Sequence, residues 1–317
     1  MPTGVPRTLV GMTWHPRQLA QQNGRTFVIT GANSGIGLEA ARDLVSRGAH
    51  VVLAVRDTAK GEQTRRVLVG PGSSSVVELD VADLDSVASA AKTISADHSG
   101  LTALVCNAGI MGGPYLLTTQ GFERQMATNH LGHAALVTAL WPLLHSAGGR
   151  VVVVSSLVAR GGRLTAQTSR EELVDPGSSY EGMQVYRNTK QANLLFALEL
   201  HRRGSRAGSP VGAVAVHPGV SATNLLHRQL SEAGSVFAPI SRLVTKVALQ
   251  SASAGALPTL RALDHSTPSG SFVGPAKFGQ VRGRPELLQP YASASDPAVA
   301  AHLWELTEDV LGAPLPV

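Results

Sequence analysis

A tyrosine and a lysine, Tyr186 and Lys190, stand four residues apart in a segment with helical periodicity. Residues at that spacing share one face of a helix, so one surface would present a phenol and an ammonium. The apolar run Val151–Val154 lies earlier in the chain and ends in two hydroxyls, Ser155 and Ser156. A nearby cation lowers the phenol pKa from about 10, so these side chains could form an acid–base site with a hydroxyl that positions a carbonyl oxygen.

Taken alone, these residues have simpler explanations. A tyrosine and a lysine at this spacing arise often by chance, and two serines can simply end a strand. Asn129, in the middle of an expected helix, could be a local cap or a satisfied polar group. The interpretation as a site therefore depends on what the neighbouring elements place in front of them.

A glycine-rich turn supplies that context. The apolar strand expected at Thr26–Thr30 runs directly into Gly31, Gly35 and Gly37, and a helical pattern then continues to Gly48. Strand, glycine turn and helix are typical of a phosphate-binding loop, because glycine lets backbone N–H groups approach a pyrophosphate and the helix N-terminus adds a favourable dipole. We therefore expect a dinucleotide to bind at this turn.

The residue after the next strand bears on the choice of dinucleotide. His50–Val55 is an apolar strand, and Arg56 stands at its end. In a dinucleotide fold, an acid at that point bonds the ribose 2′-hydroxyl, whereas an arginine favours a 2′-phosphate. Asp57 follows, but it has an alternative role as a helix N-cap. NADP(H) is therefore preferred over NAD(H), although Arg56 could also be a solvent-facing strand end.

Further strands and helices alternate along the chain. The expected strands are Ser75–Leu79, Leu101–Cys106, Val151–Ser155, Val211–Val216 and Ser271–Val273, and the expected helices are about 83–96, 119–145 and 186–203. The pattern predicts an α/β fold, a single Rossmann-type doubly wound parallel sheet of about seven strands with helices on both faces. We expect an N-terminal arm at 1–24 anchored by Trp14, one domain at 25–317, loop insertions at about 161–185 and 221–255, and a C-terminal helix at about 296–311.

Composition narrows the class of protein. The 317 residues carry a net charge of +5, but the cations are scattered, and pairs such as Arg65-Arg66 are better explained as solvated helix faces than as nucleic-acid contacts. The single cysteine, Cys106, excludes an intrachain disulfide and fits a reducing compartment. Because no apolar run approaches 18 residues and the first residues lack a signal-like core, we expect no membrane span and a cytoplasmic location.

Together the motifs resemble the short-chain dehydrogenase/reductase family. The motifs occur in the family's order and at its spacing over about 24–273. The first is the glycine turn, which begins at Thr30. It is followed by Asp80, Asn107-Ala108-Gly109, Asn129, Ser155-Ser156, Tyr186 with Lys190, and His217-Pro218-Gly219. The phrases NHLGH and HPGVSATNL look like the branch that includes retinol dehydrogenases and protochlorophyllide reductase-like proteins. The resemblance implies an NAD(P)-dependent oxidoreductase.

The resemblance also implies roles for the matched residues. Asn129, Ser156, Tyr186 and Lys190 would be the catalytic set: Tyr186 is the general acid for reduction and the base for oxidation, Ser156 holds the carbonyl oxygen, and Asn129 holds a water that links Lys190 to solvent. Lys190 would also bind the nicotinamide ribose. The cofactor would contact Gly31, Asn33, Ser34, Gly35, Ile36, Gly37, Arg56, Asp80, Val81, Asn107, Ala108, Gly109, Tyr186, Lys190, Pro218, Gly219, Val220 and Thr223.

Other chemistries fit the sequence less well. His130 and His133 stand three residues apart, but no carboxylate completes an H-E-x-x-H zinc site, so we expect core or helix-face histidines and no metal. No G-x-S-x-G turn of a serine hydrolase occurs. A second function stays open, that of a sensor or scaffold that binds NADP(H) in a Rossmann fold but has little turnover. Such proteins usually lack a member of the active set, and this chain lacks none.

The substrate is expected to be a lipophilic small molecule with a carbonyl or an alcohol group. Mostly apolar residues flank the expected hydride position and favour such a ligand, namely Ile110, Met111, Leu157, Val158 and Tyr180. The Gly- and Pro-rich segment 274–290 could cover one side of the site. Many members of the family pair through the two long helices that hold Asn129 and Tyr186, so the resemblance also implies a homodimer.

Overall fold

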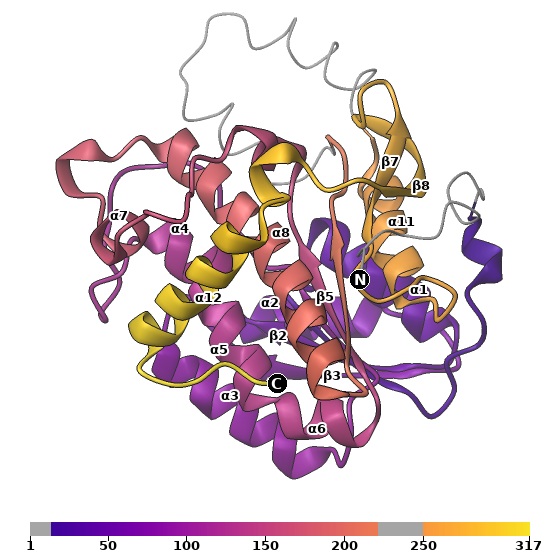
Figure 1. Cartoon of the computed structure of the whole chain (residues 1–317). Coiled ribbons are helices and arrows are strands. Elements are labelled where there is room, and N and C mark those ends of the chain that lie inside the picture. The colour runs from indigo at the N-terminus through magenta and orange to yellow at the C-terminus, as the bar shows by residue number, and fades with distance from the viewer. Residues whose placement is uncertain (1–13, 221–249) are drawn as a thin grey trace, which may run out of the picture.

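An eight-stranded sheet runs through the computed structural model, which describes residues 14–220 and 250–317 (Figure 1). In the order β3-β2-β1-β4-β5-β6-β7-β8, neighbouring strands pair in parallel except for the antiparallel pair β7–β8. The strands are β1 (Thr26–Thr30), β2 (His50–Val55), β3 (Ser73–Glu78), β4 (Ala103–Cys106), β5 (Arg150–Val154), β6 (Gly212–Val216), β7 (Phe272–Lys277) and β8 (Arg282–Leu288). The expected doubly wound parallel sheet is confirmed, with one strand more than expected.

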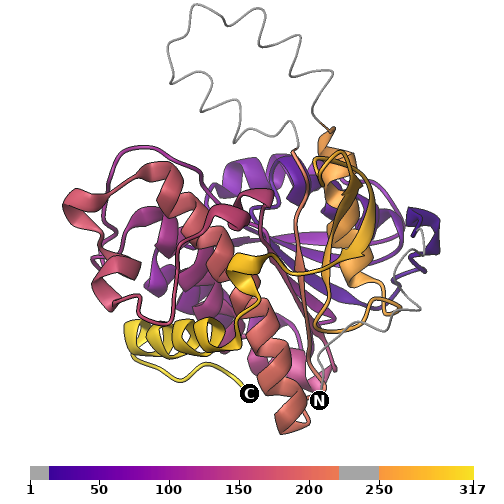
Figure 2. The same ribbon diagram turned by 45° about the horizontal axis from the view of Figure 1, so that its top comes forward.

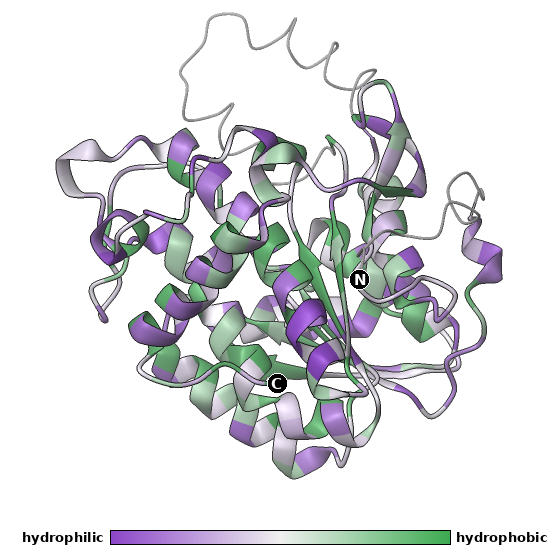
Figure 3. Cartoon of the chain, viewed as in Figure 1, coloured by the Kyte–Doolittle hydropathy of each residue, from purple (hydrophilic) through white to green (hydrophobic). Residues whose placement is uncertain are grey.

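The strands are continuous apolar runs because both faces of the sheet are buried. Along β5, Val151 and Val153 belong to one apolar core, and Val152 and Val154 belong to the other. The same alternation holds in the neighbouring strands. Successive side chains of a strand point to opposite faces, so a strand covered on both sides needs apolar residues at every position. Figure 3 shows the strands as a hydrophobic layer between helices with polar outer faces.

Helices cover both faces of the sheet (Figures 1 and 2). On one face lie α1 (Gly35–Ser46) and α11 (Ala252–Leu263), and on the other lie α3 (Leu84–Asp97), α5 (Gly132–Ala139) and α8 (Gly182–Ala207). The C-terminal helix α12 (Pro297–Leu311) packs on the outside of α8. The shorter elements are η2 (Pro16–Gln18), α2 (Thr58–Val67), α4 (Arg124–Met126), η3 (Ala127–Leu131), α6 (Trp141–Ser146), η4 (Leu157–Gly161), α7 (Arg170–Val174), η5 (Gly177–Ser179) and η6 (Ala292–Ala294).

Trp14 and Cys106 occupy the environments that the sequence indicates. Trp14 is buried, and its Nε1 donates a hydrogen bond of 2.8 Å to the Asp264 carboxylate just after α11. Trp14 therefore attaches the segment before β1 to the sheet's helical layer. Cys106 is buried in β4, and burial raises the pKa of its thiol, so it is an inert core cysteine.

The expected continuous helix from Thr119 to His145 is wrong. Residues Leu117 and Glu123 form an isolated antiparallel bridge around a turn in which Gly121 has φ 80°, and the helix begins only at α4. The π-helical turn η3 follows α4, and Pro142 separates α5 from α6 because it has no N–H to continue the helix. A π-helical turn contains one extra residue, and the spacing of apolar residues in the sequence does not reveal it. Asn129 lies within this turn.

The Gly- and Pro-rich segment 274–290 contains most of the hairpin β7–β8, whose second strand the sequence did not predict. The expected position of this segment over one side of the site stays a prediction. Pro275 and Pro285 stand opposite each other in the register of the hairpin. Proline cannot donate a ladder hydrogen bond, so the sequence pattern argues against a strand, but an edge strand such as β8 tolerates it. The α8 helix is also longer than the expected 186–203, and it ends where Gly208 takes the left-handed conformation with φ 69°.

Candidate active site

The glycine turn joins the carboxyl end of β1 to the amino end of α1. Gly31 and Gly35 have φ angles of 66° and 56°, a region that favours glycine. A Cβ on Gly37 would lie 2.6 Å from the amide nitrogen of Asn107, so a larger residue would displace that side chain. Ser34 makes no side-chain cap, which leaves the first N–H groups of α1 available to an anion. This cradle fits the pyrophosphate of a dinucleotide.

One buried hydroxyl ties the end of β1 to the end of β4. Thr30 Oγ1 accepts hydrogen bonds from the backbone N–H groups of Asn107 and Ala108, both at 2.9 Å. The side-chain amide of Asn107 returns a hydrogen bond of 2.8 Å to the Thr30 carbonyl. The strand order reverses between β1 and β4, which is where doubly wound sheets bind their ligands. Thr30 thus fixes the glycine turn relative to the loop Asn107–Gly109.

A buried histidine of α5 extends this network to Asn129. The nearest acceptor for the Thr30 O–H proton is His133 Nε2, at 2.9 Å, so His133 carries its own proton on Nδ1 and donates it to the Asn129 carbonyl at 3.2 Å. Burial lowers the pKa of His133 to about 3, and the ring is neutral at physiological pH. His130 is also buried, with Nε2 3.1 Å from the hydroxyl of Thr307. The expected core placement of both histidines is confirmed.

The side chain of Asn129 connects two walls of the site. Its Oδ1 accepts from the Ile110 N–H at 2.8 Å, and its Nδ2 donates to the Ile110 carbonyl and to Thr189 Oγ1, both at 2.9 Å. Ile110 belongs to the loop after β4, and Thr189 belongs to α8. Asn129 therefore holds that loop against the helix that carries Tyr186. Its expected role in holding a water stays a prediction.

Tyr186 and Lys190 share one face of α8, next to the carboxyl end of β5. The Tyr186 hydroxyl is hydrogen-bonded to Ser156. Lys190 Nζ donates to the Val154 carbonyl at 3.1 Å and lies 5.8 Å from the centre of the Tyr186 ring. Ser155 points elsewhere, because its hydroxyl donates to the Lys190 carbonyl at 2.6 Å. The structure thus groups Ser156, Tyr186 and Lys190, and Ser155 instead attaches α8 to the sheet.

Burial dominates the electrostatics of this group. It raises the pKa of Tyr186 to about 12, although the hydrogen bond with Ser156 acts in the opposite direction. It also lowers the pKa of Lys190 to about 8. Lys190 is not among the causes of the Tyr186 shift. The expected lowering of the phenol pKa by Lys190 together with an oxidised nicotinamide stays a prediction.

The outer part of the cradle contains two basic side chains. Arg56, at the end of β2, is 74% exposed, and its guanidinium lies 3.6 Å from the carboxylate of Asp80. Asp57 caps α2 by accepting a hydrogen bond of 2.9 Å from the Lys60 N–H, so the N-cap role that we expected is confirmed. An open hollow of about 360 Å³ is lined by Asn33, Lys60, Gln63, Thr64 and Val67. Lys60 thus shares a hollow with a residue of the glycine turn.

Asp80 and Val81, which we expect to contact the cofactor, lie just after the end of β3. Asp80 Oδ1 accepts from the Ala82 N–H at 2.9 Å, which fixes the carboxylate beside the backbone of Val81. A Cβ on Gly132 would lie only 1.8 Å from the Val81 carbonyl oxygen. The start of α5 therefore approaches Val81 as closely as only glycine permits.

The turn after β6 is held by a glutamine from a distant part of the chain. Gly219 has φ 72°, and a Cβ there would lie 2.3 Å from the Val281 carbonyl oxygen. The Gln250 side chain donates to the carbonyls of Pro218 and Val281 at 3.2 and 3.0 Å. This amide therefore joins the turn His217–Gly219 to the hairpin β7–β8. Thr223 lies outside the described residues.

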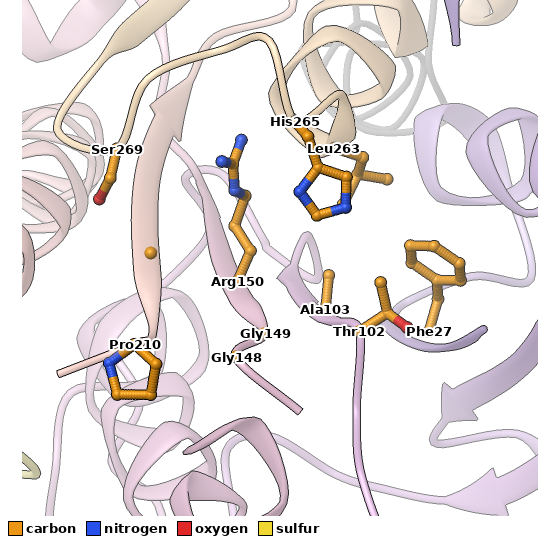
Figure 4. A pocket seen from close by; sticks show the side chains of 11 residues that line it. Phe27, Thr102, Ala103, Gly148, Gly149, Arg150, Pro210, Leu263, His265 and Ser269 are labelled. Carbon is orange, nitrogen blue, oxygen red and sulfur yellow. The ribbon is translucent and has the colours of Figure 1, made fainter. Parts of the chain in front are cut away.

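A separate cavity of about 240 Å³ lies at the opposite edge of the sheet (Figure 4). Its lining includes residues at the amino ends of β1, β4, β5 and β6, namely Phe27, Ala103, Arg150 and Gly212. Arg150 Nη1 donates to two carbonyls at the end of α11, at 2.7 and 3.2 Å, so it acts as a cap of that helix. Because the motif residues lie at the carboxyl ends of the strands, this cavity is not part of the site.

Comparison with known proteins gives consistent matches. Residues 25–167 match the family model described as short chain dehydrogenase. Retinol dehydrogenase 14 of Homo sapiens is 35% identical over 310 residues, which cover 92% of this chain and 87% of that protein. WW domain-containing oxidoreductase of Danio rerio is 34% identical over 294 residues, covering 90% and 68%. The chain belongs to the short-chain dehydrogenase family.

Solved structures share the dehydrogenase fold. The crystal structure of an uncharacterised protein from Mycobacterium Paratuberculosis is 40% identical, has a TM-score of 0.79, and aligns over 96% of this chain and 100% of that one. RhlG of Pseudomonas aeruginosa, solved as an NADP complex, is 20% identical with a TM-score of 0.63 over 82% and 96%. The dehydrogenase described here falls in the retinol dehydrogenase-like branch, and it is an NAD(P)-dependent oxidoreductase that acts on CH–OH groups.

The dehydrogenase site also contains residues that motif matching did not single out. Lys60 and Gln250 were missed, and Thr30, at which the glycine motif begins, was given no role of its own. The partners of Gln250 lie 31 and 32 residues away in the chain, and no local pattern indicates them. Over residues 14–220 and 250–317, no helix is long and apolar enough to cross a membrane, and no group of three or more His, Cys, Asp or Glu could hold a metal ion.

Proposed function

We propose that this dehydrogenase transfers hydride between NADP(H) and a carbonyl or alcohol group of an apolar small molecule, with Tyr186 as the general acid and base. The observation that carries the proposal is the hydrogen bond between Ser156 and Tyr186, with the buried Lys190 one turn further along α8. This group lies at the carboxyl ends of the strands, as does the glycine cradle that fits a dinucleotide.

Each residue of the site has a separate role in the reduction of the carbonyl group. The chemistry that NADPH would supply when bound in the glycine cradle is a hydride for the carbonyl carbon. Ser156 holds the carbonyl oxygen, and Tyr186 gives its phenolic proton to that oxygen, which completes the alcohol. With a pKa of about 12 the phenol is protonated near neutral pH, the state that reduction needs. Lys190 binds the nicotinamide ribose, and its charge stabilises the phenolate that remains.

Three features support the preference for NADP(H). Arg56 is exposed at the end of β2, and Lys60 faces the hollow that it shares with Asn33. A ribose 2′-phosphate carries the charge that such cations bind. Asp57 is engaged as the N-cap of α2, so it is not placed to hold a free 2′-hydroxyl. RhlG, which shares the fold, was solved with NADP.

An apolar substrate agrees with the walls of the site and with the relatives. Retinol dehydrogenases are named for a lipophilic alcohol. The flanking residues Ile110, Met111, Leu157 and Val158 are only partly buried, so apolar surface is available beside Tyr186. We therefore propose a long apolar aldehyde, ketone or alcohol as the substrate class, and a cytoplasmic location stays a prediction.

The test is NADPH oxidation with all-trans-retinal, aliphatic aldehydes and cyclic ketones. Tyr186→Phe removes only the phenolic oxygen, so turnover should fall by about 10²–10⁴-fold while NADPH affinity is retained, because the general acid contributes to the chemical step. Full activity of Tyr186→Phe would contradict the assigned general acid. Tight NADPH binding without turnover on the whole panel would instead favour the sensor or scaffold function.

A further inference from the structure

Two side chains of α8 share one backbone carbonyl. The Val154 oxygen, at the carboxyl end of β5, accepts a hydrogen bond of 3.1 Å from Lys190 Nζ and another of 3.0 Å from Asn193 Nδ2. A carbonyl oxygen has two lone pairs, so these two donors occupy both. Asn193 comes one helical turn after Lys190 and two turns after Tyr186, so the three side chains share one face of the helix.

The shared carbonyl lies in a buried part of the site. Lys190 is 5% exposed and Asn193 is 1% exposed, so water has little access to either donor. The helix backbone is also fixed at this point, because the Ser155 hydroxyl donates to the Lys190 carbonyl at 2.6 Å. The position of the Lys190 ammonium therefore depends on how strongly the Val154 oxygen binds it.

The ammonium has two hydrogens left for a ligand. Nζ carries three hydrogens, and the Val154 oxygen takes one of them. Within the described parts of the chain, no other acceptor forms a hydrogen bond with Nζ. Gly109, in the loop after β4, faces the ammonium, since a Cβ there would lie 3.5 Å from Nζ. The two hydrogens are thus available to the ribose hydroxyls of the cofactor, the contact that the proposed function assigns to Lys190.

Near pH 8, Lys190 is the group of this cluster that changes its charge. Burial lowers its pKa to about 8. On the side of η3 and α5, burial lowers the pKa of His130 to about 4 and that of His133 to about 3, and on α8 it raises the pKa of Tyr186 to about 12. No carboxylate of the described residues forms an ion pair with Lys190. The ammonium is therefore stabilised by the Val154 oxygen and not by an anion.

We propose that Asn193 is a positioning residue that weakens the hydrogen bond between the Val154 carbonyl and Lys190, and so keeps the ammonium available to the cofactor ribose. The two donors compete for one oxygen, and the positive end of the Asn193 amide is directed at the atom that binds the ammonium. Without this amide, the oxygen would bind the ammonium more strongly. It would draw Nζ toward β5 and stabilise the charged form. This inference rests on the proposed contact between Lys190 and the ribose.

The first test follows the protonation of Lys190 in the free protein. Asn193→Leu keeps the branched shape of the side chain and removes the competing donor. The NMR resonance of the Lys190 ε-carbon, in protein with isotope-labelled lysine, gives the pKa directly. That pKa should rise by about half a unit, because the oxygen is left to the ammonium alone. Gln191→Leu is the matched control, since Gln191 is equally buried but donates to Leu164 and Ser293, and it should leave the titration unchanged.

The second test is a double-mutant cycle with the affinity for NADPH as its readout. It is measured well below pH 8, where Lys190 is charged in both of its backgrounds. Asn193→Leu should raise the Kd for NADPH about fivefold in the wild type and leave it unchanged in a Lys190→Met background, because Asn193 acts through Lys190. Fully additive effects of the two substitutions would overturn the proposal.

Asn193→Asp is the second variant, and it decides the question even where the leucine variant does not fold. It replaces the competing donor by an acceptor that lies within about 6 Å of Nζ, so the pKa of Lys190 should rise by about one to three units. The alkaline decline in kcat/KM should move to higher pH by the same amount. A Lys190 titration that neither variant moves would refute the role of Asn193.

Failure of the proposed function would be recognised separately. A wild type that binds NADPH but reduces no substrate would refute the hydride transfer, whereas the NMR titration would still decide whether Asn193 acts on Lys190. A Kd for NADPH that Lys190→Met does not change would refute the ribose contact, and the inference with it. Normal turnover with an unmoved titration in both Asn193 variants would refute this inference alone.

Discussion

Lys190 lies one helical turn beyond Tyr186, with its ammonium 5.8 Å from the centre of the phenol ring. Burial acts on both groups in favour of their neutral forms, raising the pKa of Tyr186 to about 12 and lowering that of Lys190 to about 8. The phenol of Tyr186 therefore keeps its proton at any pH below about 12, whereas Lys190 keeps its charge only below about pH 8. Such a separation of pKa values agrees with the proposed role of Tyr186 as the acid and makes Lys190 its pH-dependent partner.

The first prediction follows from the lowered pKa of Lys190. As the pH rises through about 8, the ammonium loses its proton, and with it the ribose contact and the charge that stabilises the phenolate. The kcat/KM for aldehyde reduction should therefore be highest below that pH and decline above it. Lys190→Arg is the control, since a guanidinium stays protonated and its weaker activity should show no such decline. A wild-type profile that is flat to about pH 10 would contradict the assignment.

The second prediction concerns the basic pair at the end of the cradle. Arg56→Ala and Lys60→Ala should each weaken NADPH binding by about tenfold, since each removes a cation from the expected 2′-phosphate. NADH binding should change little, because NADH has no phosphate there. Fluorescence titration measures both constants, and Arg66→Ala, on the same helix but outside the hollow, is the control. A similar loss for NADH and NADPH would show that these side chains act on something other than the 2′-phosphate.

Much of this fold is visible in the sequence, because its cause is local. Apolar runs such as Val151–Val154 predict strands buried on both faces, and glycines at Gly31 and Gly35 predict a turn with positive φ. The hairpin β7–β8 is hidden by Pro275 and Pro285, whose tolerance depends on β8 being at the edge of the sheet. Edge position is a property of the assembled sheet and cannot be found in a local pattern.

The candidate site, like the fold, could be predicted from the sequence only in part. Their spacing together with the glycine turn upstream indicates Tyr186 and Lys190. The direction of the Tyr186 pKa shift depends on how deeply the phenol is buried, and burial is known only once the chain has folded. Asn193 and Gln250 are polar residues in ordinary surroundings in the sequence, and their partners come from other elements. Contacts between distant segments are therefore the part that sequence reasoning did not supply.

The third prediction tests the hydroxyl of Thr30. Thr30→Val keeps the shape of the side chain but leaves the half-buried N–H of Ala108 without its acceptor and the N–H of Asn107 with only the Val105 carbonyl. An unsatisfied buried donor costs about 1–3 kcal/mol, so the free energy of unfolding should fall by an amount within that range, and NADPH affinity should fall with it. Thr30→Ser restores the oxygen and should recover most of both quantities. Denaturant unfolding and cofactor titration measure them, and a valine variant as stable as the wild type would refute this role.

The last prediction concerns oligomeric state. The resemblance to the family implies pairing through the helices that hold Asn129 and Tyr186, but α12 already covers the outside of α8. The Trp304 ring stacks on Phe196 at 5.6 Å and 19°, and Arg203 lies over Trp304 at 4.8 Å. A stable interface buries about 1,200–2,000 Å² in total, and the docked α12 occupies part of the α8 surface that pairing would use. We therefore expect a monomer of 33.0 kDa by size-exclusion chromatography with light scattering.

A variant that loosens α12 makes this prediction sharper. Trp304→Ala removes a side chain that is 2% exposed, which should cost about 3–5 kcal/mol and uncover the apolar face around Phe196. The mass should then rise with protein concentration, as exposed apolar surface associates. Glu305→Ala, the exposed neighbour on the same helix, should leave the protein monomeric. A wild-type dimer whose mass Trp304→Ala does not change would show that pairing uses another face and that α12 does not control it.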